Sequence, residues 1–198
     1  MFGLSVHLKI FLKHSDYAIP FNTMKKFILL LSLVSIVPVF AIDGLYLGVQ
    51  GGQVQLLGNT KDLHDNAIGF GVDIGIRTQS YLDVMFQSQM STHTGYTSVA
   101  KITKATDLKI YSQTLGANIH FGTSDFDFTL GGGPGVYFIN SSTSNTYFGL
   151  HVAGGADVVV SDQLRLGLQA RYHFLFKQEL KDDYWSIMAR IGYQFDLG

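Results

Sequence analysis

Bulky apolar residues alternate with small or polar ones along most of the chain after residue 44. The clearest run is residues 68–77, where even positions hold Ile, Phe or Val and odd positions hold Gly, Asp or Arg. Successive side chains of a β-strand point to opposite faces, so this period of two indicates a strand with one apolar face and one small or charged face.

The same alternation predicts eight strands. They span residues 44–55, 67–77, 81–90, 107–121, 126–139, 147–160, 164–176 and 184–196. In the fourth, Leu115, Ala117, Ile119 and Phe121 define the apolar face, whereas its first half is ambiguous.

The connections between these strands alternate in length. Tight hairpin turns are expected at 78–80, 122–124 and 161–163, and longer polar connections at 56–66, 91–106, 140–146 and 177–183. In a closed antiparallel sheet this places the short turns at one end and the longer loops at the other. The sequence therefore predicts an all-β, closed, eight-stranded, antiparallel up-and-down barrel.

The glycines indicate which face of the barrel meets water. A soluble barrel of lipocalin type has the same alternation with its apolar face inward. Its outer face would then carry glycines that weaken strands, whereas small residues fit the narrow interior of an eight-stranded barrel. They are Gly69, Gly71, Gly75, Gly131, Gly133, Gly135, Gly149, Gly155 and Gly167. This favours a transmembrane barrel with its apolar face outward.

Aromatic residues near the strand ends support the membrane interpretation, because aromatic girdles flank the apolar band of such barrels. The expected girdles are Phe121, Phe126, Tyr193 and Phe195 at the short-turn end, and Phe138, Tyr172, Tyr184 and Trp185 at the other. Lipid cannot satisfy an open sheet edge, so the eighth strand must pair with the first.

Residues 24–41 have the organisation of a secretory signal peptide. A basic start at Met24-Lys25-Lys26 precedes the uncharged residues 27–41, which end in a small-residue cleavage pattern. Because an apolar run of 15 residues or fewer is short for a spanning helix, an uncleaved anchor is the less favoured alternative. Residues 1–23 are interpreted as an upstream extension before a start codon at Met24, or alternatively as part of the signal, and residues 42–198 as the barrel.

Composition and charge exclude several classes of protein and of binding site. Charged residues make up 15% of the chain, against about 25% in typical soluble domains. The absence of cysteine excludes a disulfide framework, a thiolate metal site and a lipid-modified N-terminal cysteine. Without the four Lys and one Asp of residues 1–41, 10 basic and 14 acidic residues remain, a charge of about −4 that argues against nucleic acid binding.

Several stretches resemble the small eight-stranded outer-membrane barrels, the group of the OmpA transmembrane domain, OmpX and OmpW. They are GLYLG at 44–48, FTLGGGPGVYF at 128–138 and LRLGLQARYHF at 164–174. The resemblance covers residues 42–198 and implies the outer membrane of a Gram-negative cell, periplasmic termini and extracellular loops. Residues 187–195 look like the C-terminal strand that the barrel assembly machinery reads, although three residues follow Phe195, where the family ends on an aromatic residue.

Charged residues are predicted inside the barrel in equal numbers of each sign. The alternation places Asp73, Asp83, Asp127, Asp157, Arg77, Arg165, Arg171 and Arg190 inward. Since an unpaired buried charge costs several kcal/mol, we expect ion pairs that fill the interior as a structural plug. A gated ion path is the alternative.

A turn at 161–163 places His151 opposite His173, both inward, with Cβ atoms about 5 Å apart. Two imidazoles could begin a metal site, but zinc takes three or four protein ligands and only Asp157 or His120 offers distant help. A hydrogen-bonded histidine pair is therefore favoured. No metal site and no cofactor are assigned.

No catalytic set is recognised. Lipid A deacylases, which are also small barrels, need a His and a Ser close in sequence, and Arg171-Tyr172-His173-Phe174 has no such Ser. Nucleophile-elbow, phosphate-loop and dinucleotide motifs are missing from the sequence. We therefore expect a non-enzymatic protein, with a lipid-modifying enzyme as the least favoured alternative.

The favoured function is a structural or surface-interaction role carried by the extracellular loops, particularly 91–106 with His93, Tyr96, Lys101 and Lys104. The alternative is an OmpW-like conduit for small hydrophobic molecules or ions. Expected partners are outer-membrane lipids and lipopolysaccharide, the assembly machinery, and a host or surface ligand, but no nucleic acid. A monomer suffices, because eight strands can close within one chain.

Overall fold

The computed structural model describes residues 42–79, 81–95, 106–176 and 183–197, which form a β-barrel. Its strands are β1 (Gly44–Leu56), β2 (Ala67–Gln79), β3 (Leu82–His93), β4 (Leu108–Gly122), β5 (Phe126–Asn140), β6 (Ser144–Val159), β7 (Leu164–Leu175) and β8 (Tyr184–Asp196), and a short 3-10 helix, η1 (Gly58–Asp62), follows β1. Among the described residues, no helix has the length and hydropathy to cross a membrane. The expected extension and signal peptide, residues 1–41, lie outside the described part.

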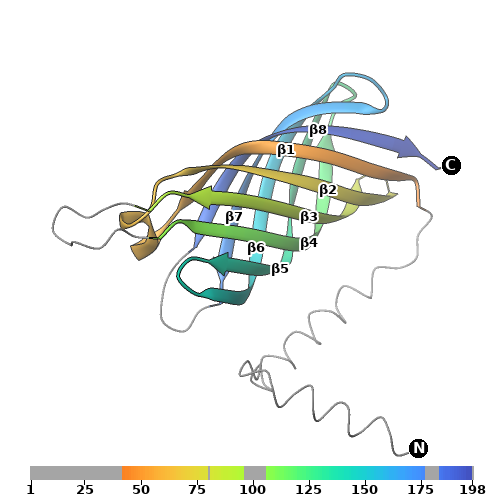
Figure 1. The fold of residues 1–198 in the computed structure, drawn as a ribbon. Coiled ribbons are helices and arrows are strands. Elements are labelled where there is room, and N and C mark those ends of the chain that lie inside the picture. Colours follow the sequence, from red (N-terminus) through yellow and green to blue (C-terminus); the bar gives the residue numbers. More distant parts are fainter. Residues whose placement is uncertain (1–41, 80, 96–105, 177–182, 198) are drawn as a thin grey trace, which may run out of the picture. The chain divides into compact units, whose positions relative to one another are not determined.

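The barrel is closed as predicted. Each strand pairs antiparallel with the next, and β8 pairs with β1 from Gly44↔Asp196 to Leu56↔Tyr184. Figure 1 shows this continuous wall. The start of β1 and the end of β8 therefore lie together at the end of the barrel that carries the short turns.

All eight predicted strands are confirmed, with ends that shift by up to three residues. The prediction was wrong for the connection between β5 and β6, which is Ser141–Thr143 and not a loop over 140–146. Ser144 to Thr146 continue the ladder opposite Phe138 to Asn140. Hydrophobic periodicity does not detect these three residues, because they are polar. A strand end that projects into water needs no apolar face.

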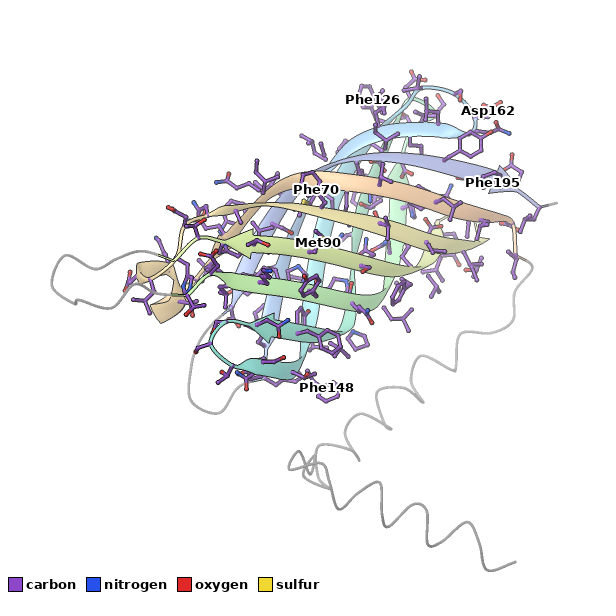
Figure 2. All side chains as sticks on the ribbon, viewed as in Figure 1. Phe70, Met90, Phe126, Phe148, Asp162 and Phe195 are labelled. Atoms are coloured by element: carbon purple, nitrogen blue, oxygen red, sulfur yellow. The ribbon has the colours of Figure 1, made fainter. Side chains whose placement is uncertain are left out.

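The apolar face points outward. Ile68, Leu130 and Leu168 are 59–69% exposed, and Phe70, Met90 and Phe195 project from the outside of the wall (Figure 2). This arrangement is stable in a membrane, because the outward apolar side chains contact the hydrocarbon chains of the lipid. One girdle residue was assigned wrongly: Tyr184 is 1% exposed and lies inside the barrel.

Small residues on the inner face make room for large ones, as expected. A Cβ atom at Gly192 would lie 2.1 Å from the hydroxyl oxygen of Tyr46, so only glycine allows the Tyr46 ring to lie there. The ambiguous first half of β4 also becomes clear, because Leu108 and Ile110 are buried inside the barrel.

A proline interrupts the wall between β4 and β5. The ladder runs to Thr114↔Gly135 and resumes at Ala117↔Gly132, which leaves Pro134 outside it. The backbone N–H and C=O groups of even-numbered residues in β5 point toward β4. The hydrogen bond from the Thr123 N–H to the Phe126 carbonyl oxygen shows this orientation. Because proline has no N–H, β5 cannot donate to β4 at this position.

Candidate functional site

The interior is the candidate site, because all eight charged residues predicted to lie inward do so. Six are buried, and the side chains of Asp127 and Arg165 are each 13% exposed. They occupy successive layers from the short-turn end to the middle of the barrel. Beyond them, toward the long-loop end, apolar and aromatic side chains predominate in the interior, with a few buried polar ones such as Ser112 and Ser186.

At the short-turn end, one histidine joins two ion pairs into a network. Arg77 Nε lies 2.8 Å from Asp83 Oδ1, and Arg165 pairs with Asp127. His120 connects them, with Nε2 2.6 Å from Asp83 Oδ2 and Nδ1 2.8 Å from Asp127 Oδ2. Sequence reasoning considered His120 only as a distant metal ligand. Its inward parity on β4 was the signal that could have placed it with the charges.

This network borders a cavity of about 600 Å³ at the same end. Arg77, His120, Asp127 and Arg165 line it together with the turn that follows β4. Arg77 also donates to Gln194 Oε1 at 2.9 Å. Side chains from β2, β3, β4, β5, β7 and β8 therefore converge at this mouth and bind one another.

The next layer is the pair Asp157–Arg190. Arg190 Nε donates to Asp157 Oδ1 at 2.7 Å, and its Nη2 donates to the other carboxylate oxygen. Both residues are at most 5% exposed. Two hydrogen bonds between a guanidinium and a carboxylate are the geometry that best offsets the loss of hydration.

The two remaining charges, Asp73 and Arg171, are joined through a glutamine and not by a direct ion pair. Gln50 Nε2 donates to Asp73 Oδ1 at 2.8 Å, and its Oε1 lies 3.4 Å from Arg171 Nη2. Arg171 also donates to Gln89 and Gln169. Sequence reasoning missed these glutamines because it counted only charges, although an amide can donate to a carboxylate and accept from a guanidinium at once.

The predicted register of the two histidines is confirmed, but no hydrogen bond joins their rings. His151 and His173 are register partners on β6 and β7, with ring centroids 6.1 Å apart. Tyr184 stacks on His173 at 4.2 Å, and the Tyr137 hydroxyl lies 3.1 Å from His173 Nδ1. Within the described residues, no three His, Cys, Asp or Glu side chains gather as a metal site would require. The two histidines belong to an aromatic cluster instead.

Continuous with this cluster, apolar and aromatic side chains fill the long-loop end of the interior. They are Val54, Leu56, Leu108, Ile110, Tyr137, Ile139, Leu175, Tyr184 and Met188, each at most 9% exposed. Side chains this deeply buried pack against one another and do not line an open passage. This apolar layer was not predicted, because the inward positions were interpreted only as small or charged.

An outward apolar band around a narrow, filled interior defines a small transmembrane barrel of the outer-membrane class. Residues 27–197 match the family described as outer membrane protein beta-barrel domain, and the chain belongs to this family. The protein is thus an eight-stranded β-barrel of the outer membrane. No curated protein matches the sequence significantly.

Solved structures share this fold at low sequence identity. The Neisserial surface protein A structure is 19% identical, with a TM-score of 0.61, and the match covers 76% of this chain and 97% of that one. OprG of Pseudomonas aeruginosa is 14% identical, with a TM-score of 0.59 over 79% and 98%. Ail, the attachment invasion locus protein of Yersinia pestis, is 17% identical, with a TM-score of 0.53 over 78% and 100%.

Proposed function

We propose that the protein is a non-enzymatic, closed barrel that displays its loops on the cell surface. The observation that carries this proposal is the filled interior. Ion pairs occupy it from the short-turn end to the middle, and packed apolar side chains occupy the long-loop end. A plug of this kind stabilises the wall and leaves the loops as the variable part. The filled interior therefore favours a scaffold role. A conduit for small apolar molecules would need an open apolar mouth.

The first long connection is a well-anchored candidate surface. The Asp65 N–H donates to the Thr94 carbonyl, and His93 Nδ1 lies 2.8 Å from the Asp65 carbonyl oxygen. His64 Nε2 lies 3.0 Å from the Thr106 carbonyl oxygen. These contacts fix the segment after β1 against both ends of the connection that follows β3. Pre-ordered loops bind partners at a lower entropic cost, so an ordered platform here suits recognition.

The printed names of two similar structures, a surface protein and an attachment protein, agree with a surface role. A lipid-modifying activity is disfavoured by His173, which is fully buried and stacked on Tyr184, away from lipid. The proposed export route begins with a signal peptide at residues 24–41, cleaved before the barrel at 42–198, in a Gram-negative cell. The assembly machinery would then read β8.

Two measurements test this proposal. An epitope inserted after Ser142 should be accessible to antibody on intact cells, whereas the same epitope after Ser124 should need permeabilised cells. The reverse result would contradict the proposed orientation, with the termini in the periplasm. Planar-bilayer recordings of the refolded barrel should show no sustained conductance, and stable channel openings in the unmodified protein would contradict a closed plug.

A further inference from the structure

The loop platform, residues 58–65, 93–95 and 106–107, contains a histidine that contacts two separate connections. His64 lies between η1 and β2. Its Nδ1 lies 3.2 Å from the Thr60 carbonyl oxygen in η1, and its Nε2 lies 3.0 Å from the Thr106 carbonyl oxygen, just before β4. The imidazole thus joins the connection after β1 to the end of the connection after β3.

Backbone contacts hold the imidazole in this position. His64 forms an antiparallel bridge with Gly95, and the Asp65 N–H donates to the Thr94 carbonyl at 3.0 Å. The Gly95 N–H in turn donates to Asp107 Oδ1 at 3.3 Å. Both ends of the connection after β3 are therefore brought to His64, one by backbone pairing and the other through Asp107.

Both oxygen atoms that face the ring are acceptors, and this decides which form of the imidazole fits. A neutral imidazole carries one N–H and one lone pair, so it can donate to only one of the two carbonyl oxygens. Its other nitrogen then turns a lone pair toward an oxygen lone pair. The protonated ring carries two N–H groups and donates to both. Because hydrogen bonds from a charged donor are stronger than neutral ones, protonated His64 joins the two connections most firmly.

The other histidine of the platform has different partners. His93 Nδ1 lies 2.8 Å from the Asp65 carbonyl oxygen, whereas its Nε2 lies 3.1 Å from the Ser91 hydroxyl oxygen. A hydroxyl group can donate as well as accept, so a neutral His93 satisfies both of its ring nitrogens. His93 is also fully buried, whereas His64 is half-buried. Of the two, only His64 gains a hydrogen bond when it takes up a proton.

Several other charged or titratable groups lie on the elements around His64. They are Lys61 and Asp62 of η1, Asp65, His93 on β3, Asp107 before β4 and Lys109 on β4. Carboxylates and lysines in water keep their charge between about pH 5.5 and about pH 7.5, whereas histidine changes its charge in this range. Within the described part of the platform, a response to mild acid therefore points to a histidine.

We propose that His64 is a clasp that closes the loop platform in mildly acidic surroundings. Protonation joins η1 to the segment before β4, and loss of the proton releases one of the two contacts. A platform closed in this way binds a partner at a lower entropic cost, so recognition should strengthen as the pH falls. That consequence rests on the proposed surface role, whereas the clasp itself does not.

The chain contains no cysteine, so two nitroxide labels can be attached at chosen positions. Leu63→Cys and Thr106→Cys place them on the two sides of the clasp, where both native side chains are exposed. Dipolar electron paramagnetic resonance of the refolded barrel in phosphatidylcholine vesicles measures the close and the distant populations of the labels. We expect the close-to-distant ratio to rise about fivefold from about pH 7.5 to about pH 5.5, the effect of one added hydrogen bond.

Two variants of the labelled barrel assign the response. His64→Gln presents one donor nitrogen at either pH and should abolish the pH dependence. Asp107→Asn is the matched control, because its amide oxygen still accepts from the Gly95 N–H without a charge, and it should keep the fivefold rise. A shift in gel mobility on boiling verifies that each variant folds.

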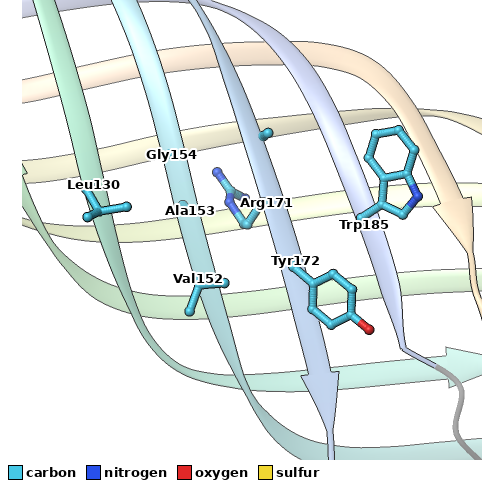
Figure 3. Close-up of a pocket in the computed structure, with 8 residues that line it drawn as sticks. Leu130, Val152, Ala153, Gly154, Arg171, Tyr172 and Trp185 are labelled. Atoms are coloured by element: carbon cyan, nitrogen blue, oxygen red, sulfur yellow. The ribbon is translucent and has the colours of Figure 1, made fainter.

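The wall of the barrel supplies an internal control. Trp185 is the only tryptophan, and it pairs with Tyr172 on the outer wall (Figure 3). Its fluorescence should be the same at both pH values, because the clasp changes contacts between loops and leaves the strands as they are.

Four results would overturn the proposal. Equal label distances at both pH values would mean that the clasp does not respond to protons, and a wider separation at the lower pH would reverse its sign. A response that persists in His64→Gln, or one that is lost in Asp107→Asn, would assign it to another group. A pH-dependent Trp185 emission would place the change in the wall. None of these measurements needs a partner or a particular orientation, so a failure of the surface role is detected separately by the epitope and conductance experiments.

Discussion

Arg190 on β8 binds Asp157 on β6 although β7 runs between these two strands. The residue of β7 that pairs with both is Gly167. A Cβ atom at Gly167 would lie 1.8 Å from Asp157 Oδ1 and 2.4 Å from the Ala156 carbonyl oxygen. The guanidinium and the carboxylate therefore meet only because the strand between them has no side chain at that point.

Gly167→Ala should destabilise the barrel. The added methyl group displaces Asp157 from Arg190 and overpacks the interior, and we expect a loss of about 3 kcal/mol in the free energy of unfolding. Urea titration of the barrel in lipid vesicles measures it. Gly154→Ala, on the open outer face of β6, is the control and should be neutral or stabilising by up to about 1 kcal/mol. Equal effects of the two substitutions would contradict the role of Gly167.

Asp157→Asn should cost about 3–5 kcal/mol, because it leaves the buried Arg190 guanidinium without a carboxylate. Removing both charges, with Arg190→Met in the same chain, should cost less than the sum of the two single changes. A double-mutant cycle from urea unfolding gives this coupling directly. Additive effects would mean that the two side chains do not stabilise one another.

Met188→Ala should destabilise far more than Ile187→Ala. Met188 is 1% exposed in the apolar cluster, whereas its neighbour Ile187 is 43% exposed toward lipid. A cavity in the packed interior costs about 2–5 kcal/mol, while lipid can fill the space left outside, so we expect less than about 1 kcal/mol there. Unfolding in the same vesicles compares them. Similar losses would place Met188 in a loosely packed interior.

Pro134→Val should stabilise the wall. The substitution supplies an N–H toward β4, where the ladder lacks a donor, and one recovered hydrogen bond is worth about 1 kcal/mol. Amide hydrogen exchange at positions 132–136 should slow in parallel. Pro134→Gly restores the same N–H with a more flexible backbone and should gain less. If neither variant is more stable than the parent, an N–H at this position finds no acceptor.

The pattern of amino acids alone predicts the strands, their inward and outward faces, the closed barrel and one register. Alternation reports which face a residue occupies, and this depends only on local strand geometry. A short turn fixes the pairing that follows it, which is why the His151↔His173 partnership could be predicted. The polar strand end Ser144 to Thr146 was assigned wrongly, because an apolar pattern carries no signal where a strand leaves the membrane. Tyr184 was assigned to the girdle from its place near the strand end, although its even position on β8 places it inward.

Which inward side chains contact one another depends on the three-dimensional packing of the barrel. Arg190 reaches Asp157 across a strand, His120 links two ion pairs, and Arg171 is held by glutamines, none of which follows from a list of inward positions. Contacts across a barrel interior depend on strand tilt, on side-chain length and on the glycines that leave space between them. The apolar side chains at the long-loop end lie at inward positions of the alternation, and the structure adds how they pack against one another.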